Sequence, residues 1–310
     1  MSASIRIGNA PCSWGSLEFE GMEGKGIGYA QMLDELAETG YAGTELGDWG
    51  YMPTVPGALR AELERRSLTM LGAFVPVALK HKERHAPGTA VAVRTARLLA
   101  AVAAPDYAPC LVLADENGTV PARTQNAGRV TADLALSADE WAVFAAGAEE
   151  VARAVRDDTG LRTVFHHHCA GYVETPDEIA ALMRRTDPEL LGLVFDTGHY
   201  ALGTGSPATD AVLEGLDRFA DRIWYMHYKD CAPEVAARVR EQRLDYFEAV
   251  AQGVFCELGQ GCCDFARGSA WLRDRAYDGW ICVEQDVLPG MGAPRDSARR
   301  NREFLRGLGL

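Results

Sequence analysis

The sequence lacks any long apolar run: nowhere in its 310 residues does an uninterrupted apolar stretch approach 18 residues. A membrane-spanning helix needs about 20 such residues, so no transmembrane segment is expected. The first residues, MSASIRIGNAPCSWG, contain no apolar core of a secretory signal peptide and lead directly into a strand-like segment. We therefore expect a cytoplasmic protein with no membrane partner.

The sequence is also poor in basic residues, because 31 lysines and arginines stand against 44 aspartates and glutamates, giving a net charge of −13. Nucleic acids and anionic membranes attract basic patches, so we expect neither as the main partner. The remaining composition, 47% hydrophobic and 24% charged, is typical of a globular protein. A chain of this length can bury a large core.

Two common motifs are missing. The eight cysteines include no Cys-x-x-Cys pair, and the adjacent Cys262 and Cys263 do not match a zinc ribbon, so we expect reduced thiols rather than a disulfide framework. No GxGxxG follows the first strand-like segment, and Gly259-Gln-Gly261 alone is a weak signal for a phosphate-binding loop. A nucleotide-binding open sheet is therefore disfavoured.

Short strand-like segments alternate with helical patterns along the chain. Helical spacing of apolar residues over 27–39 ends at Gly40, and Ser137 with Glu140 forms a capping-box signature before a long helix. Eight strand-like segments in this alternation predict parallel βαβ units and match a (β/α)8 TIM barrel, which takes about 250 residues or more. We expect one domain over 1–310, with an open doubly wound sheet as the competing fold. The strand-like segments are 4–12, 41–46, 68–78, 110–114, 161–168, 190–196, 223–227 and 279–284.

Three of the seven histidines are consecutive, at the point where the segment LRTVFHHH meets a turn of small residues at 169–171. Alternation along a strand places His166 and His168 on one face and His167 on the other. The turn can still redirect a side chain, so His167 stays a candidate for substrate binding. Imidazole is the commonest neutral metal ligand, although the triplet alone is equally consistent with a polar strand end.

Carboxylates and imidazoles also end other strand-like segments, namely at Glu45, Asp196, His227 and Glu284, and His199 lies one turn beyond. In a barrel, catalytic residues gather at the carboxyl ends of the strands, so we expect these side chains to converge. Such donors suit a divalent cation: Mn²⁺, Co²⁺, Mg²⁺ or Zn²⁺. Each residue alone has a simpler interpretation, since Asp196 could cap the next turn and Glu284 could pair with an arginine.

Four motifs carry a family resemblance: FDTGH at 195–199, MHYKD at 226–230, GQGCCDF at 259–265 and GWICVEQD at 279–286. They resemble the xylose-isomerase-like barrel superfamily, which includes sugar isomerases and epimerases and endonuclease IV. FHHH with Gly171, followed by ET at 174–175, together with GNAPCSWG and GTELG, is similar to the 2-keto-myo-inositol dehydratase (inosose dehydratase) branch. The resemblance covers almost the whole chain and implies a homo-oligomer.

The resemblance implies one Mn²⁺ or Co²⁺ held by a glutamate, an aspartate, a histidine and a second glutamate. Carried over, Asp196, His227 and Glu284 take the last three places. Histidines stand where many relatives have the first glutamate, and His168 is the first candidate there, with His166 second. A site richer in nitrogen favours a transition metal over Mg²⁺.

The implied reaction removes water from a cyclic keto-polyol, giving an enol that becomes a dione. It needs a cation to polarise the ketone, a base to take the neighbouring proton, and an acid to protonate the leaving hydroxyl. A small polyol or sugar is the implied substrate. The catalytic candidates are Lys229, His166, His199 and Glu45, and the substrate-binding candidates are Trp14, Glu45, His167 and Asp230.

Two other functions remain open. A metal-dependent sugar or inosose isomerase or epimerase would use two acid–base groups on opposite faces of the substrate and lose no water. A non-catalytic sugar-binding protein is a remote alternative, because the sequence keeps a complete ligand set. The net charge of −13 argues against a DNA-repair nuclease.

Overall fold

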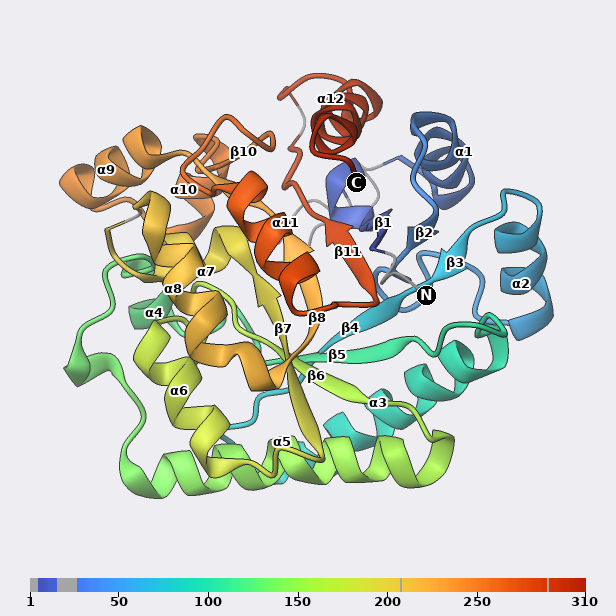
Figure 1. Cartoon of the computed structure of the whole chain (residues 1–310). Helices are drawn as coiled ribbons and strands as arrows, with labels where there is room; N and C mark the ends of the chain where they lie inside the picture. The colour runs from blue at the N-terminus through green and yellow to red at the C-terminus, as the bar shows by residue number, and fades with distance from the viewer. Residues whose placement is uncertain (1–4, 16–26, 207, 289) are drawn as a thin grey trace.

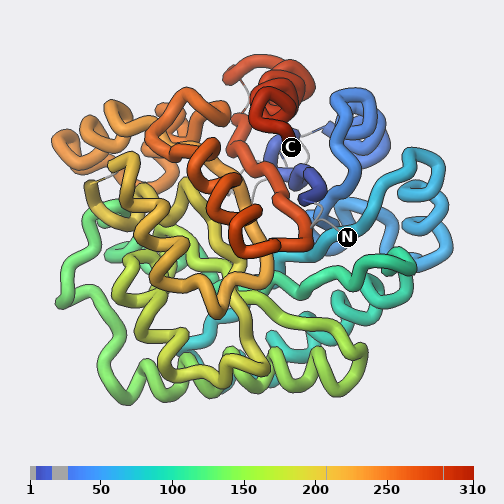
Figure 2. Tube along the Cα trace, in the orientation of Figure 1, coloured from blue at the N-terminus to red at the C-terminus, as the bar shows by residue number. Residues whose placement is uncertain are grey.

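The structure, a computed structural model, describes residues 5–15, 27–206, 208–288 and 290–310. Parallel strands form one curled sheet with helices packed around its outside (Figure 1), and the chain trace follows the same arrangement (Figure 2). Neighbouring strands follow the order β3-β2-β1-β11-β8-β7-β6-β5-β4. The predicted (β/α)8 barrel is confirmed, and its strands are all parallel, as expected.

The sheet closes within one short segment, because β3 (Thr69–Met70) and β4 (Gly72–Pro76) are separated only by Leu71. The Leu71 N–H donates to the Thr44 carbonyl on one side, and the Leu71 carbonyl accepts from the Cys110 N–H on the other. β3 and β4 therefore count together as one of the eight strands of the barrel. The other positions are β1 (Arg6–Asn9), β2 (Gly43–Thr44), β5 (Cys110–Ala114), β6 (Thr163–His166), β7 (Leu191–Asp196), β8 (Ile223–Tyr228) and β11 (Trp280–Val283).

Several helices begin or end at capping residues. Ser137 and Glu140 form a reciprocal capping box at the start of α5, and Gly160 ends that helix with a φ of 72°. Thr175 and Glu178 form the same box on α6. The helices are α1 (Tyr29–Thr39), α2 (Pro56–Glu64), α3 (Lys82–Val102), α4 (Pro121–Gln125), α5 (Ala138–Thr159), α6 (Pro176–Arg185), α7 (Thr197–Gly203), α8 (Thr209–Phe219), α9 (Pro233–Gln242), α10 (Tyr246–Ala251), α11 (Phe265–Asp274) and α12 (Pro294–Gly307).

Alternation along the strands divides the core into two layers. Val164 and Val194 belong to a small cluster that also contains Tyr225 and Trp280 from neighbouring strands. Phe165, by contrast, belongs to the large cluster shared with the helices. Since every second residue of a strand faces the same way, the last residues of β6 and β7 point to the same side as the small cluster, which is the barrel interior.

The fold departs from the sequence-based prediction in the second half of the chain. Two short strands, β9 (Asp230–Cys231) and β10 (Phe255–Cys256), pair antiparallel outside the barrel. Helix α9 follows β9, and α10 precedes β10. Several strands are also shorter than predicted, and β6 ends at His166. No helix in the described ranges is long and apolar enough to cross a membrane.

Candidate active site and metal centre

A pocket opens at the carboxyl ends of the strands, on the rim where the sequence predicted a site. Its walls come from segments far apart in the chain, because the barrel closes on itself. Some of the residues predicted from the sequence line it, and several further lining residues were not predicted. The lining includes Cys12, Glu45, Asn117, Gly118, His166, His168, Lys229, Tyr246, Phe247, Glu284 and Asp286.

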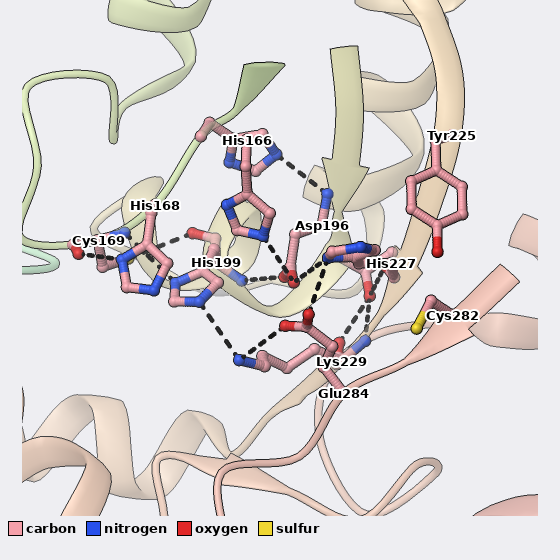
Figure 3. Close-up of polar contacts among 12 residues, drawn as sticks. His166, His168, Cys169, Asp196, His199, Tyr225, His227, Lys229, Cys282 and Glu284 are labelled. Carbon is pink, nitrogen blue, oxygen red and sulfur yellow. Dashed lines mark hydrogen bonds and ion pairs between the residues drawn. The ribbon is translucent and has the colours of Figure 1, made fainter. Parts of the chain in front are cut away.

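Four side chains converge at one end of this pocket (Figure 3): His166, Asp196, His227 and Glu284 each contribute one donor atom, all within 4.8 Å of one another. Oδ2 of Asp196 lies 3.8 Å from Nε2 of His166 and 3.9 Å from Nδ1 of His227. Strand register explains the meeting, since Asp196 on β7 pairs with His227 on β8.

The donor atoms of this cluster point toward a common centre rather than forming hydrogen bonds with one another. Oδ2 of Asp196 and Nδ1 of His227 are buried without a hydrogen-bond partner among the described residues. Nδ1 of His227 is 3.1 Å from Oε1 of Glu284, yet this contact lacks hydrogen-bond geometry. Buried polar atoms without partners are costly, and two nitrogens with two carboxylate oxygens suit a divalent transition metal. The residues therefore fit such an ion.

Neighbouring groups hold two of these side chains by their other atoms. Asp196 is the N-cap of α7, and its Oδ1 accepts the His199 N–H at 2.7 Å, which leaves Oδ2 for the cluster. On the far side of the His227 ring, Nε2 lies 2.8 Å from Oε1 of Glu45, which also accepts the Tyr225 hydroxyl at 2.9 Å. Glu45 lines the pocket, but its hydrogen bonds orient His227.

The three consecutive histidines have three different surroundings. His166 is part of the cluster. His167 faces away from it: its Nε2 accepts the backbone N–H of Asp196 at 3.1 Å, and its ring packs edge-on against Phe195. His168 lies against His199, with ring centroids 3.8 Å apart. The backbone leaves the strand after His166, so alternation does not carry His168 into the cluster. The first candidate for the fourth ligand is therefore outside it, and the second candidate is inside.

Lys229 is the central cation of the pocket. Its side chain is buried, with Nζ 3.0 Å from Oδ1 of Asp286, 3.3 Å from Oε2 of Glu284 and 3.4 Å from Nε2 of His199. The ammonium also lies 4.7 Å from the centre of the Phe255 ring. Sequence reasoning missed Asp286, although it ends the GWICVEQD motif two residues after Glu284.

Two residues predicted to bind substrate are engaged elsewhere. Trp14 is buried, and its Nε1 donates to Oε2 of Glu35 on α1 at 2.8 Å. Asp230 is fully buried, and its carboxylate accepts four backbone N–H groups, from Gly259, Gly261, Cys231 and Cys263. Neither residue lines the pocket, because one serves the core and the other shapes a loop.

Burial and close charges set the protonation of the site. Burial disfavours the imidazolium of His227, but Glu284 and Glu45 outweigh it and raise the pKa of His227 to about 9. Burial raises the pKa of Asp196 to about 7. The pKa of Lys229 is raised despite burial, because Asp286 and Glu284 favour the ammonium. Burial and Lys229 lower the pKa of His168 to about 3, so its imidazole is neutral.

Comparison with known proteins identifies the family of this barrel. A family model described as xylose isomerase-like TIM barrel matches residues 33–308. The chain belongs to this family. The inosose dehydratase of Geobacillus kaustophilus (strain HTA426) is 32% identical over 301 residues, which are 97% of this chain and 94% of that protein. The inosose dehydratase of Lacticaseibacillus casei (strain BL23) is 30% identical over 306 residues, 98% of this chain and 96% of that protein.

Solved structures of other proteins share the fold at low identity. D-allulose 3-epimerase from Methylomonas sp. superposes with a TM-score of 0.67 at 16% identity, covering 99% of this chain and 100% of that one. The probable 3-DHS dehydratase from Bacillus anthracis gives a TM-score of 0.66 at 13% identity, covering 97% of this chain and 99% of that one. These similarities concern the barrel alone.

Proposed function

We propose that this chain is a divalent-metal-dependent hydro-lyase that removes water from a cyclic keto-polyol such as 2-keto-myo-inositol, giving a dione. Inosose dehydratases match it over nearly its whole length, so the chain is an enzyme of a sugar-modifying type. The observation that carries the finer proposal is the convergence of His166, Asp196, His227 and Glu284 beside a buried lysine.

In this proposal, His166, Asp196, His227 and Glu284 hold the ion, with His166 in the place where many relatives have a glutamate. Mn²⁺ or Co²⁺ suits the two-nitrogen, two-oxygen donor set better than Mg²⁺. When bound, a divalent cation polarises a ketone and makes the neighbouring C–H more acidic. Glu45 keeps the His227 ring oriented by accepting a hydrogen bond from its Nε2.

His168 is the proposed base. Its Nδ1 lies 2.6 Å from the Cys169 carbonyl, which can only accept, so the ring proton sits on Nδ1 and Nε2 keeps its lone pair. The low pKa of His168 keeps the ring neutral at pH 7. A neutral imidazole on the pocket wall can take the proton from the carbon beside the ketone.

Lys229 is the proposed acid. The carboxylates of Asp286 and Glu284 keep its ammonium charged, so it can donate a proton or a strong hydrogen bond to the departing hydroxyl. His199, 3.4 Å from Nζ, helps to position the lysine side chain. Loss of hydroxyl from one carbon and of the proton from its neighbour gives the enol, which becomes the dione.

The test is incubation of the purified protein with 2-keto-myo-inositol and Mn²⁺ or Co²⁺. We expect a product lighter by the mass of one water, with the absorbance of a conjugated dione, and no product after chelation. A product of unchanged mass but altered configuration would favour the alternative, a metal-dependent isomerase or epimerase. Unchanged substrate that nevertheless binds would favour a sugar-binding protein.

A further inference from the structure

Four of the eight cysteines gather behind the pocket, at positions 231, 256, 262 and 263, and all eight are free thiols. Cys231 lies on β9, Cys256 on β10, and the other two in the loop that follows β10. The backbone of Lys229 adjoins this region, since its carbonyl oxygen lies 3.6 Å from the Sγ of Cys263. The proposed reaction uses none of these thiols.

Cys231 and Cys262 are neighbours in both backbone and side chain. The Cys262 N–H donates to the Cys231 carbonyl at 2.9 Å, as between adjacent strands. The Cys262 thiol is also the first influence on the pKa of the Cys231 thiol, which it raises. The direct backbone bond keeps the two residues close, as a disulfide requires, since the Cα atoms of a disulfide lie about 4.4–6.8 Å apart.

The loop that carries Cys262 is held in place without any disulfide. The carboxylate of Asp230 accepts the N–H groups of Gly259 and Gly261 through Oδ2 and that of Cys263 through Oδ1. Gly261 is required for this close approach, because a Cβ there would lie 2.4 Å from the Cys231 carbonyl oxygen. The two thiols are therefore brought together before any bond forms between them.

The neighbouring thiols differ in reactivity. The neighbouring thiols of Cys231 and Cys263 lower the pKa of Cys262, which favours the nucleophilic thiolate. Cys263 points instead toward the carbonyls of Thr197 and Lys229, each 3.6 Å from its Sγ. Cys262 is 9% exposed and Cys231 is fully buried. Of this pair, Cys262 is the more exposed thiol, so a small oxidant reaches it before Cys231.

We propose that Cys231 and Cys262 are a dithiol that a hydroperoxide converts reversibly to a disulfide. The Cys262 thiolate attacks one peroxide oxygen, forming an S–O bond while the O–O bond breaks; the other oxygen leaves as hydroxide and takes up the proton that Cys262 had released, giving water. The Cys231 sulfur then attacks the sulfur of the Cys262 sulfenic acid, forming the S–S bond while the S–O bond breaks, and the departing hydroxyl takes the Cys231 thiol proton and leaves as a second water. Two thiols are oxidised by two electrons and one hydrogen peroxide becomes two waters.

The disulfide would close a loop that contains α9, α10 and β10. Because the two residues are already joined by a backbone hydrogen bond, closure needs little movement, and the cross-link restricts mainly the unfolded chain. For a loop of this length we expect the melting temperature of the oxidised protein to rise by about 5 °C, an effect that reduction reverses. The helix α10 also carries Tyr246, a pocket-lining residue.

The experiment is treatment of the full chain with a small excess of hydrogen peroxide, followed by blocking of free thiols and peptide mapping by mass spectrometry with and without reductant. We expect one cross-linked pair joining positions 231 and 262, lost in Cys262→Ser and kept in Cys263→Ser and Cys110→Ser. Mapping of the wild-type protein alone decides the pairing, so the result does not depend on folding of a variant. The proposal requires no substrate, so it stands apart from the proposed activity.

Three outcomes would overturn the inference. One is a vicinal bond between Cys262 and Cys263. Another is oxidation of Cys262 to sulfinic acid without any cross-link. The third is a thiol content unchanged by an excess of peroxide that oxidises a model dithiol completely.

Discussion

Asp196 uses its two carboxylate oxygens for two different tasks: Oδ1 accepts the backbone N–H of His199 at 2.7 Å, and Oδ2 faces His166 and His227 without a hydrogen-bond partner in the described ranges. The N-cap bond fixes the carboxylate plane, so the free oxygen is aimed before any ligand arrives. This one side chain therefore sets both the start of α7 and the orientation of the cluster.

We expect His166→Ala and His168→Ala to fail in different ways. His166 belongs to the cluster, so its loss should lower bound Mn²⁺ or Co²⁺ well below one ion per chain. His168 lies outside it, so His168→Ala should keep the metal and lose about 10²–10⁴-fold in kcat, the usual contribution of a general base. Metal content by elemental analysis alongside steady-state kinetics separates the two, and metal loss in His168→Ala with normal loading of His166→Ala would reverse the assignment.

Glu45→Gln should weaken metal binding without unfolding the protein. The Glu45 carboxylate orients the His227 ring through its 2.8 Å contact with Nε2, and losses of such outer partners typically cost about 10–100-fold in metal affinity or activity. Tyr225→Phe is the matched control, because it removes only the hydroxyl bonded to the same oxygen. Equal Mn²⁺ affinity in Glu45→Gln and wild type, measured by titration calorimetry, would argue against this role.

Gly198→Ala should lower kcat while the protein stays folded. A Cβ on Gly198 would lie 2.6 Å from Cγ and 2.9 Å from Cβ of Lys229, so the lysine has to shift away from Asp286. Gly57→Ala is the control, because an added Cβ there meets no atom within 4 Å. Kinetics and melting curves of both variants check the prediction; identical kcat values would show that the position of Lys229 is not critical.

The stability of the protein should fall as pH rises from about 4.5 to 7 through Glu174. Burial raises the pKa of this carboxyl to about 7, so in that window the folded chain keeps a proton that the unfolded chain has released. Higher pH therefore favours the unfolded state, by on the order of 3 kcal/mol over the full shift.

The neutral Glu174→Gln variant tests this pH dependence. The carboxylate accepts the N–H groups of Gly128 and Ala170, so the glutamine variant should be less stable at pH 5, where wild-type Glu174 is neutral. The deficit should shrink toward pH 7, where the wild type carries the buried charge. Chemical denaturation at both pH values gives the comparison, and a deficit that stays constant or grows would mean that the carboxyl titrates normally in the fold.

Position at a strand end was enough to predict most of the cluster. Asp196, His227 and Glu284 follow apolar segments, and a parallel barrel brings such positions to one rim. The choice among the three histidines was not predictable, because alternation applies only while the backbone remains extended, and β6 ends at His166. A single sequence gives no sign of that endpoint, since His167 and His168 continue the same residue type.

The surroundings of loop residues were also difficult to predict. Asp230 lies inside a motif that ends a barrel strand, so it resembled a site residue. Its carboxylate instead accepts four backbone N–H groups, three of them from loop residues about 30 positions away. Tyr246 and Phe247 reach the pocket from α10, which no strand-end rule could indicate. The position of α10 depends on the pairing of β9 with β10, which brings the segment between them back to the barrel.

The closure of the barrel at Leu71 has a consequence for contacts between molecules. Since the backbone of this residue bonds to β2 on one side and to β5 on the other, the barrel sheet presents no free strand edge within the part of the chain that the structure describes. Unpaired edges are the usual template for sheet-to-sheet association and aggregation. Copies of this chain that meet through the barrel wall therefore contact one another through side chains of helices and loops, which makes such contacts a matter of surface complementarity rather than of backbone pairing.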